Sequence, residues 1–316
     1  MQVFWIILTV AAGLALLLLA ACYICFYIAF YVPEKNKHPK EEFELPVGKV
    51  YEPYSEAMIG WMKDVRALPH EDMRITTFDG STLVGTYYEY APGAPIELMF
   101  HGYRGTAERD LCGGVQRCFK LGRSALLVDQ RAARRSDGHV ITFGVKEHKD
   151  CLCWVDYMLE RFGPDVRIIL CGISMGATTV LMAAGEELPD NVIGVLADCG
   201  FSTGKAIIHK VIRQLKLPVG PVYPLIRLGG RIFGGFDVED SDALTAMRKC
   251  KKPVIFFHGT DDDFVPWQMS RENCEACASQ KELVCIPGAG HGLSYLIDPP
   301  GYLKALREFG QRWWGL

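Results

Sequence analysis

Short apolar segments alternate with amphipathic segments along most of the chain, and this alternation restricts the folds open to it. Eight segments have the length and composition of strands: 73–78, 83–90, 96–100, 125–128, 166–171, 192–197, 254–257 and 283–286. Segments with a helical pattern are 56–67, 108–121, 145–161, 175–186, 241–249, 268–280 and 302–313. Apolar strands that alternate with helices predict an α/β fold, a mostly parallel eight-stranded sheet with helices on both faces. Asp79-Gly80 favours a hairpin, so the sheet should begin with an antiparallel pair.

The N-terminal 32 residues differ from the rest of the chain. No charged residue occurs from Val3 to Val32, and about 20 apolar residues are enough to cross a bilayer as a helix. A cleaved signal peptide would have a basic start and a shorter apolar run, and Met1-Gln2 offers no basic side chain. Leu19 to Cys22 resembles a lipoprotein signal, but the sequence stays apolar for ten further residues. We therefore expect residues 1–32 to be an uncleaved transmembrane anchor, preceding the α/β domain.

Flanking charges and cysteines predict the orientation of this anchor. Lys35, Lys37 and Lys40 follow the apolar segment and no basic residue precedes it, which favours a cytoplasmic domain. Twelve cysteines are scattered along the chain, several of them in expected strands or helices. Such positions suit buried thiols in a reducing compartment. The pair Cys274 and Cys277 has no second ligand pair at a zinc-site spacing, so we expect no metal.

Three regions follow from composition. Residues 33–53 are rich in charge and proline and are interpreted as a linker, and residues 54–316 as one α/β domain. Within it, residues 203–238 interrupt the alternation and are interpreted as a lid. The apolar residues of this lid would either line an acyl pocket or pack the lid onto the domain; they are Val222, Tyr223, Leu225, Ile226, Ile232 and Phe233. The net charge of −3 gives no electrostatic signature for nucleic acid.

Ser174 is the candidate nucleophile. It lies between Gly172 and Gly176 in the sequence GISMG, after an expected strand and before an expected helix. A serine on such a tight turn is exposed at the carboxyl edge of the sheet, and the flanking glycines avoid clashes across the turn. The adjacent helix N-terminus favours developing negative charge. Without this context, the pentapeptide would be only a serine in a glycine-rich bend.

A histidine and several carboxylates follow Ser174, and the order, serine first and histidine last, matches the hydrolase arrangement. His291 lies in PGAGHGLSY, just after the last expected strand, where it could move a proton between Ser174 and a leaving group. The acid comes from Asp261, Asp262 or Asp263 after the preceding strand, with Asp198 as a further candidate. The alternatives are a surface histidine and aspartates that only stabilise a turn.

The loop FHGYRG at residues 100–105 is the candidate oxyanion site. Its glycines allow backbone N–H groups to face a substrate oxygen, so the N–H groups of Tyr103 and Met175 would form the oxyanion hole. His101 and His258 also follow strands, and we expect both to be structural.

Together these motifs resemble the α/β-hydrolase superfamily from about Met73 to the C-terminus. The matching residues are 172–176, His101-Gly102, His258-Gly259 through Val265-Pro266, and 290–292. Residues 126–138 resemble the DxRGxGxS segment of membrane-anchored bacterial esterase-like members, some of them similar to serine aminopeptidases. Ala132 replaces a glycine of that segment, and Arg135 stands before Ser136. By this resemblance Asp262 is the catalytic acid.

The resemblance implies a Ser-His-Asp mechanism through an acyl-enzyme, without cofactor or metal. The expected substrate is a small-molecule or lipid-like carboxylic ester, with the membrane as a partner through the anchor. A serine peptidase of the aminopeptidase kind would share these motifs. A catalytically idle membrane-tethered binding protein on the same scaffold is the other alternative, because fold does not fix function.

Overall fold

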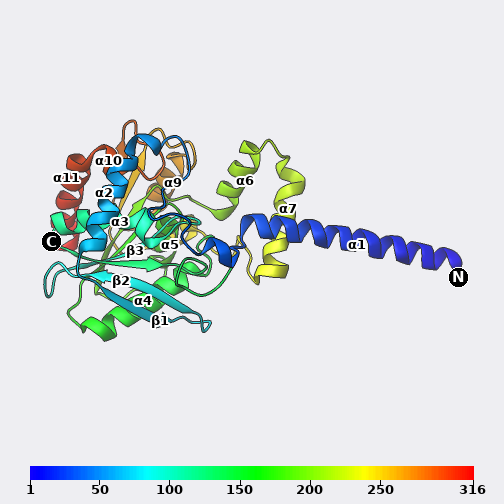
Figure 1. The fold of residues 1–316 in the computed structure, drawn as a ribbon, viewed down its shortest axis with the longest axis horizontal. Helices are drawn as coiled ribbons and strands as arrows, with labels where there is room; N and C mark the ends of the chain where they lie inside the picture. Colours follow the sequence, from blue (N-terminus) through cyan, green and yellow to red (C-terminus); the bar gives the residue numbers. More distant parts are fainter.

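The computed structural model describes all 316 residues, and its centre is one eight-stranded sheet (Figure 1). The strand order is β1-β2-β4-β3-β5-β6-β7-β8. The strands are β1 (Glu71–Thr76), β2 (Thr82–Tyr88), β3 (Ile96–Phe100), β4 (Ser124–Asp129), β5 (Ile168–Ile173), β6 (Val192–Asp198), β7 (Val254–Gly259) and β8 (Lys281–Ile286). Each of the eight expected strands is present, with ends that differ by at most two residues.

The direction of the strands also agrees with the sequence. The pairs β1–β2 and β2–β4 are antiparallel, and the other five pairs, from β3 to β8, are parallel. The hairpin between β1 and β2 turns at Gly80, whose φ of +83° suits glycine. Because β3 to β8 are parallel, the residues that follow them lie at one edge of the sheet, where ligands of such sheets bind.

Helices cover both faces of the sheet, as the alternation predicts. One apolar core lies between the sheet and α2 (Ser55–Ala67), α3 (Ala107–Lys120) and α11 (Pro299–Phe309). The other lies between the sheet and α4 (Glu147–Phe162), α5 (Met175–Ala183) and α8 (Ala243–Met247). Three further elements pack around the sheet: α9 (Gln268–Ala276), α10 (Ser294–Ile297) and the turn η4 (Gly310–Trp314). The central strands β3, β4 and β7 are buried throughout because both of their faces are covered.

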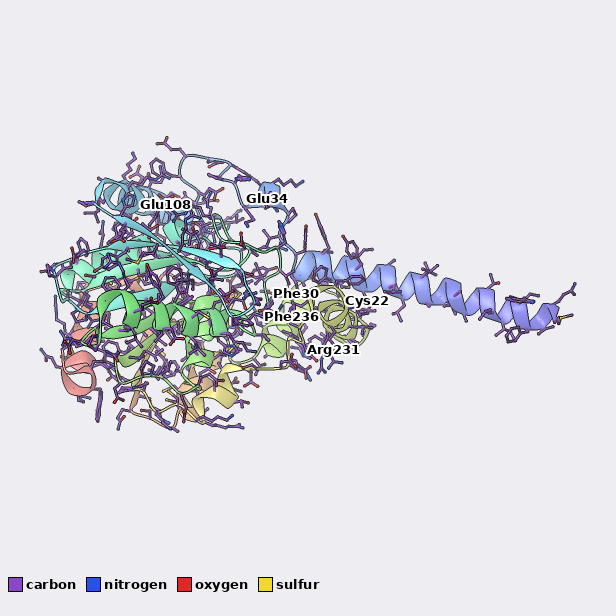
Figure 2. All side chains as sticks on the ribbon, turned by 90° about the horizontal axis from the view of Figure 1, so that it is seen from below. Cys22, Phe30, Glu34, Glu108, Arg231 and Phe236 are labelled. Atoms are coloured by element: carbon purple, nitrogen blue, oxygen red, sulfur yellow. The ribbon has the colours of Figure 1, made fainter.

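The N-terminal helix α1 (Gln2–Ala29) extends away from this domain (Figure 1). It is one helix that is long and apolar enough to cross a membrane. Only its last turns contact the domain, and the side chains of Cys22 and Phe26 are buried there. Phe30, just after the helix, is also buried, and its ring lies 5.0 Å from that of Phe236 (Figure 2).

Residues 203–238 form two helices and a turn beside α1. Helix α6 (Gly204–Gln214) is capped by the Thr203 hydroxyl, which accepts a bond of 3.0 Å from the N–H of Ala206. Helix α7 (Val219–Gly229) follows and continues into the π-helical turn η3 (Gly230–Gly234). Figure 1 shows α7 running across α1.

Residues 33–53 follow the surface of the domain and do not extend freely from it. They contain two short 3-10 turns, η1 (Glu34–Asn36) and η2 (Glu52–Tyr54, which ends just beyond them). The carboxylate of Glu44 pairs with Arg134 at 2.6 Å, and the hydroxyl of Tyr51 donates to the carbonyl of His291 at 3.0 Å. This segment is therefore fixed against the edge of the sheet that holds Ser174 and His291.

Candidate active site

Ser174 occupies a strained turn between β5 and α5. Its backbone has φ +55° and ψ −120°, a conformation that non-glycine residues adopt only where the surroundings enforce it. A Cβ on Gly172 would lie 2.1 Å from the carbonyl oxygen of Gly176, and one on Gly176 would lie 2.0 Å from that of Phe100. Glycine is therefore required on both sides of Ser174, as the sequence predicts.

His291 lies in the loop after β8 and faces Ser174. Its Nε2 is 2.8 Å from Ser174 Oγ, and its Nδ1 is 2.7 Å from Asp262 Oδ2. Since a carboxylate only accepts, Nδ1 carries the proton and Nε2 is free to accept the proton of the serine hydroxyl. The imidazole is thus oriented as a base toward Ser174.

Asp262 is held from all sides in the turn after β7. Its Oδ1 accepts from the N–H groups of Phe264 at 2.9 Å and Val265 at 2.8 Å, while its Oδ2 faces His291 and His258. Burial raises the pKa of this carboxyl, but the hydrogen bonds from the two histidines outweigh it and hold the pKa well below its usual range. Asp262 is therefore ionised at neutral pH.

The other candidate aspartates do not contact His291. The Asp261 carboxylate accepts a hydrogen bond from the Thr260 hydroxyl at 2.9 Å. Asp263 accepts hydrogen bonds only at its backbone carbonyl, from Lys210 and Gln214. The buried Asp198 side chain accepts from Ser294 at 2.9 Å and Tyr302 at 3.1 Å. Of the four aspartates, only Asp262 is brought to the histidine.

His258 contributes to the site, although its position in the sequence indicated only a structural residue. Its Nε2 lies 3.1 Å from Asp262 Oδ2 and 2.9 Å from the carbonyl of Val265. Both neighbours are acceptors, so Nε2 is the protonated nitrogen, and Nδ1 accepts from the Ser270 hydroxyl at 2.7 Å. His258 is fully buried and fixes the acid. The sequence feature that could have indicated this role is the position of His258 near the end of β7, four residues before Asp262.

The loop after β3 lies against Ser174. A Cβ on Gly102 would be 3.4 Å from that of Ser174, and the Gly102 N–H is engaged by Asp110 at 3.0 Å. The N–H of Tyr103 has no hydrogen-bond acceptor, and Met175 is the first residue of α5, where N–H groups have no partner within the helix. These are the two donors that the sequence assigns to an oxyanion. His101 braces the loop, accepting from the Gln130 N–H at 3.1 Å.

A cavity of about 560 Å³ opens beside Ser174 and His291. Residues 46–51 form one wall of it, and Trp61, Tyr295 and Phe264 line other parts. No residue of 203–238 contributes to this lining. Instead, Tyr223 and Ile226 are buried beside α1 and the domain, and Ile232 is exposed. One wall of the cavity therefore comes from the segment before α2, while α6 approaches the site from outside the cavity, through the carbonyl of Asp263 and the ring of Phe264.

One group of potential metal ligands lies in this site. Ligand atoms of Cys199, Asp262 and His291 lie within 4.8 Å of one another. Burial raises the pKa of the Cys199 thiol well above its ordinary value, whereas a metal requires the thiolate. The facing atoms of Asp262 and His291 are already bonded to each other. These residues suit proton transfer and do not suit a metal.

Comparison with known proteins places these features in context. No family model matches the chain. The uncharacterized protein YqkD of Bacillus subtilis is 28% identical over 190 residues, which are 60% of this chain and 62% of YqkD, so the chain spans less than two thirds of that protein. The bifunctional esterase/perhydrolase DCH of Acinetobacter calcoaceticus is 24% identical over 266 residues, covering 69% of this chain and 92% of DCH.

Solved structures establish the fold. The esterase Pf2001 of Pyrococcus furiosus superposes with a TM-score of 0.66 at 23% identity, covering 86% of this chain and 97% of that one. Est1E of Butyrivibrio proteoclasticus, with ferulic acid bound, gives 0.58 at 22% identity and covers 76% and 98%. The chain therefore has the α/β-hydrolase fold, as the resemblance of its motifs predicts.

Proposed function

We propose that the protein is a serine hydrolase that cleaves carboxylic esters. The observation that carries this proposal is the continuous chain of hydrogen bonds from Ser174 Oγ through His291 to Asp262, at 2.8 and 2.7 Å. The strained turn under Ser174 supports it, because such strain persists where a nucleophile must be presented. The esterase DCH and the esterases of the same fold support the choice of an ester as substrate.

In the proposed reaction Ser174 Oγ attacks the ester carbonyl carbon while His291 Nε2 takes the hydroxyl proton. The developing oxyanion is bound by the N–H groups of Tyr103 and Met175. His291 then gives the proton to the leaving alkoxide, and the C–O bond of the ester breaks to leave an acyl-Ser174. Water, deprotonated by His291, attacks this acyl group and releases the acid, which restores the serine. Asp262 stays ionised throughout and stabilises the imidazolium.

We also propose that residues 1–32 anchor the protein in a membrane with the domain in the cytoplasm. The length and hydropathy of α1 support the anchor. The lysines after α1 and the twelve free cysteines support the orientation. In this proposal residues 33–53 connect the anchor to the domain and also form part of the wall of its cavity.

The test is covalent labelling of the full chain in detergent with a fluorophosphonate, followed by mass spectrometry of the labelled peptide. We expect one label, on Ser174, and none on folded Ser174→Ala, which removes little volume from the turn. A panel of p-nitrophenyl esters and aminoacyl amides then separates ester hydrolysis from peptide hydrolysis. An unlabelled folded protein would favour the idle binding protein, and faster turnover of the amides would favour the peptidase.

A further inference from the structure

The exposed face of α7 has the composition of a buried surface. The side chains that recur along this face, just before, within and just after α7, are Leu217, Pro221, Pro224, Leu228 and Ile232, spaced three or four residues apart. Leu217, Leu228 and Ile232 are 46%, 37% and 49% exposed. A helix on the surface of a soluble domain normally presents charged and polar residues on this face, and here the face carries none.

The one charged side chain of α7 is paired with acidic residues of the domain. Its single charged residue, Arg227, pairs with Asp237 at 2.8 Å and with Glu239 at 3.2 Å. Arg231, which lies in the turn that follows and is labelled in Figure 2, also binds Asp237. Two exposed cations, Arg213 and Lys216, lie just before α7. The apolar face of α7 therefore has basic residues just before its N-terminal end, whereas the arginines at its C-terminal end are paired with Asp237 and Glu239.

Helix α1 fixes the level at which α7 lies. Its residues up to 20 are exposed, and the first buried one is Cys22. At 1.5 Å per residue, the roughly 20 free residues span about 30 Å, the thickness of the hydrocarbon core of a bilayer. Gly229 of α7 packs on α1 at this level, because a Cβ there would lie 2.5 Å from the carbonyl oxygen of Cys22. Helix α7 runs across α1 at that point (Figure 1).

We propose that α7 lies in the plane of the membrane interface, with Leu217, Leu228 and Ile232 inserted among the lipids. This inference rests on the proposed anchoring by α1 and adds a second contact with the bilayer. A helix that crosses a membrane-spanning one, is apolar on its outer face and follows two basic residues has features of an interfacial helix. Arg213 and Lys216 then face the lipid phosphates. A lipid bilayer is the partner that fits this face, because α1 places α7 at the level of the membrane surface.

The membrane contact also orients the active site. Helix α6, which precedes α7, binds the carbonyl of Asp263 through Gln214 at 3.2 Å and through Lys210. Asp263 is the neighbour of Asp262 and lines the cavity. Helix α6 therefore connects the helix that we place in the interface with the rim of the cavity.

Photochemical crosslinking from single positions tests this placement in the full chain. The photoreactive residue p-benzoylphenylalanine replaces Leu228, and in matched proteins it replaces Leu14 of α1 or Trp313. Leu14 is 62% exposed and reports on the anchor, while Trp313 is 41% exposed and lies near the C-terminus, at the opposite end of the molecule (Figure 1). Each protein is reconstituted in vesicles of phosphatidylcholine and phosphatidylglycerol and irradiated. The peptides are then analysed by mass spectrometry.

We expect the mass shift of one phospholipid on the peptides that contain positions 14 and 228, and no such shift at position 313. Adducts at position 14 without adducts at 228 would overturn the interfacial helix while leaving the anchor intact. A crosslink from 228 to a second copy of the chain would also overturn it, because that copy would then cover the apolar face. No adduct at position 14 would overturn both the anchor and this inference. Fluorophosphonate labelling of Ser174 in the same vesicles reports on the proposed hydrolase separately.

Discussion

The phenol of Tyr103 donates a hydrogen bond of 2.7 Å to the carbonyl oxygen of Ala29, the last residue of α1. Arg104 binds the carbonyls of Ile28 at 2.8 Å and Tyr31 at 3.1 Å. The final carbonyls of a helix have no hydrogen-bond partner within the helix, and a cation at this end interacts favourably with the helix dipole. Two adjacent residues of the loop beside Ser174 therefore cap the N-terminal helix, which links the proposed anchor directly to the proposed oxyanion hole.

Tyr103→Phe tests this link. The substitution removes the bond to Ala29 but keeps the Tyr103 N–H, so it should loosen the loop at a net cost of about 1 kcal/mol. We expect kcat for p-nitrophenyl acetate to fall several-fold with KM little changed, since the oxyanion forms only in the transition state. Tyr27→Phe is the control, because the Tyr27 hydroxyl makes no hydrogen bond within the protein. Equal rates for wild type and Tyr103→Phe would show that α1 does not position this loop.

Asp262→Asn tests the choice of acid. The amide would let His291 adopt the wrong tautomer, so we expect kcat to fall by about 10³–10⁴-fold. Asp261→Asn and Asp263→Asn should stay close to wild type, because neither side chain reaches His291. Steady-state kinetics on one p-nitrophenyl ester, with circular dichroism as a check of folding, measures this. Similar losses in all three variants would contradict the assignment.

His258→Ala tests whether His258 positions the acid. Loss of the donor to Asp262 Oδ2 should lower kcat by about 10–100-fold, the scale of partners that orient a reactive group, with KM nearly unchanged. His258→Gln should recover much of this loss, because its amide nitrogen reaches the place of Nε2 and can donate to Asp262. A purely structural role predicts reduced stability in both variants but normal kcat in the folded fraction.

Ala132→Gly should stabilise the protein. Ala132 has φ +63°, a left-handed conformation that costs a non-glycine residue about 1–2 kcal/mol. After the greater chain entropy of glycine is subtracted, we expect a gain of about 0.5–1 kcal/mol in the free energy of unfolding. Urea unfolding of the two proteins measures it. Ala133→Gly is the control, since φ there is not positive, and it should destabilise.

Acid should destabilise the protein through Glu97, a buried residue of β3. It binds Arg123 at 2.7 Å and also Arg117. Burial raises the pKa of Glu97, but the two arginines outweigh it and lower the pKa to about 2. In the unfolded chain the pKa is about 4.3, so between these values the unfolded state binds more protons. The stabilisation by Glu97 is therefore complete above about pH 4.5 and is lost as pH falls toward 2.

Glu97→Gln should remove this part of the pH dependence and lower the free energy of unfolding at neutral pH by about 3–5 kcal/mol, because it leaves two buried cations short of a partner. Denaturant unfolding between pH 2 and pH 7 measures both effects. Glu160→Gln, at an exposed position, is the control. If Glu97→Gln kept the acid sensitivity of wild type in this range, Glu97 would not be its source.

The sequence predicted the sheet and the turn at Ser174 because both depend on local patterns. Apolar runs separated by helices define β3 to β8, and the glycines at 172 and 176 are required by backbone contacts that any sharp turn of this kind would make. The contact of His258 with Asp262 could not be predicted in this way. It depends on how the turn after β7 folds back on its own strand, and the sequence around His258 also fits an ordinary strand end.

The packing of the region before α2 and of residues 203–238 was hardest to predict, because it also depends on contacts between distant parts of the chain. Composition indicates a linker at 33–53, but it does not show that Tyr51 binds the loop of His291, more than 200 positions away in the chain. The apolar residues of 203–238 predict that this segment is buried, but they do not show which element it packs against. That partner is α1, through contacts such as Gly229 on Cys22, which hydropathy alone cannot reveal.

The wall formed by residues 46–51 has a practical consequence for work with this protein. Removal of the apolar N-terminus is the usual way to obtain a soluble enzyme, and a cut anywhere before α2 would look harmless from the sequence. A cut at residue 54 would instead take away one side of the cavity together with the Tyr51 bond behind His291. Substrate profiles measured on such a shortened chain would describe a wider cleft than the one the intact protein offers.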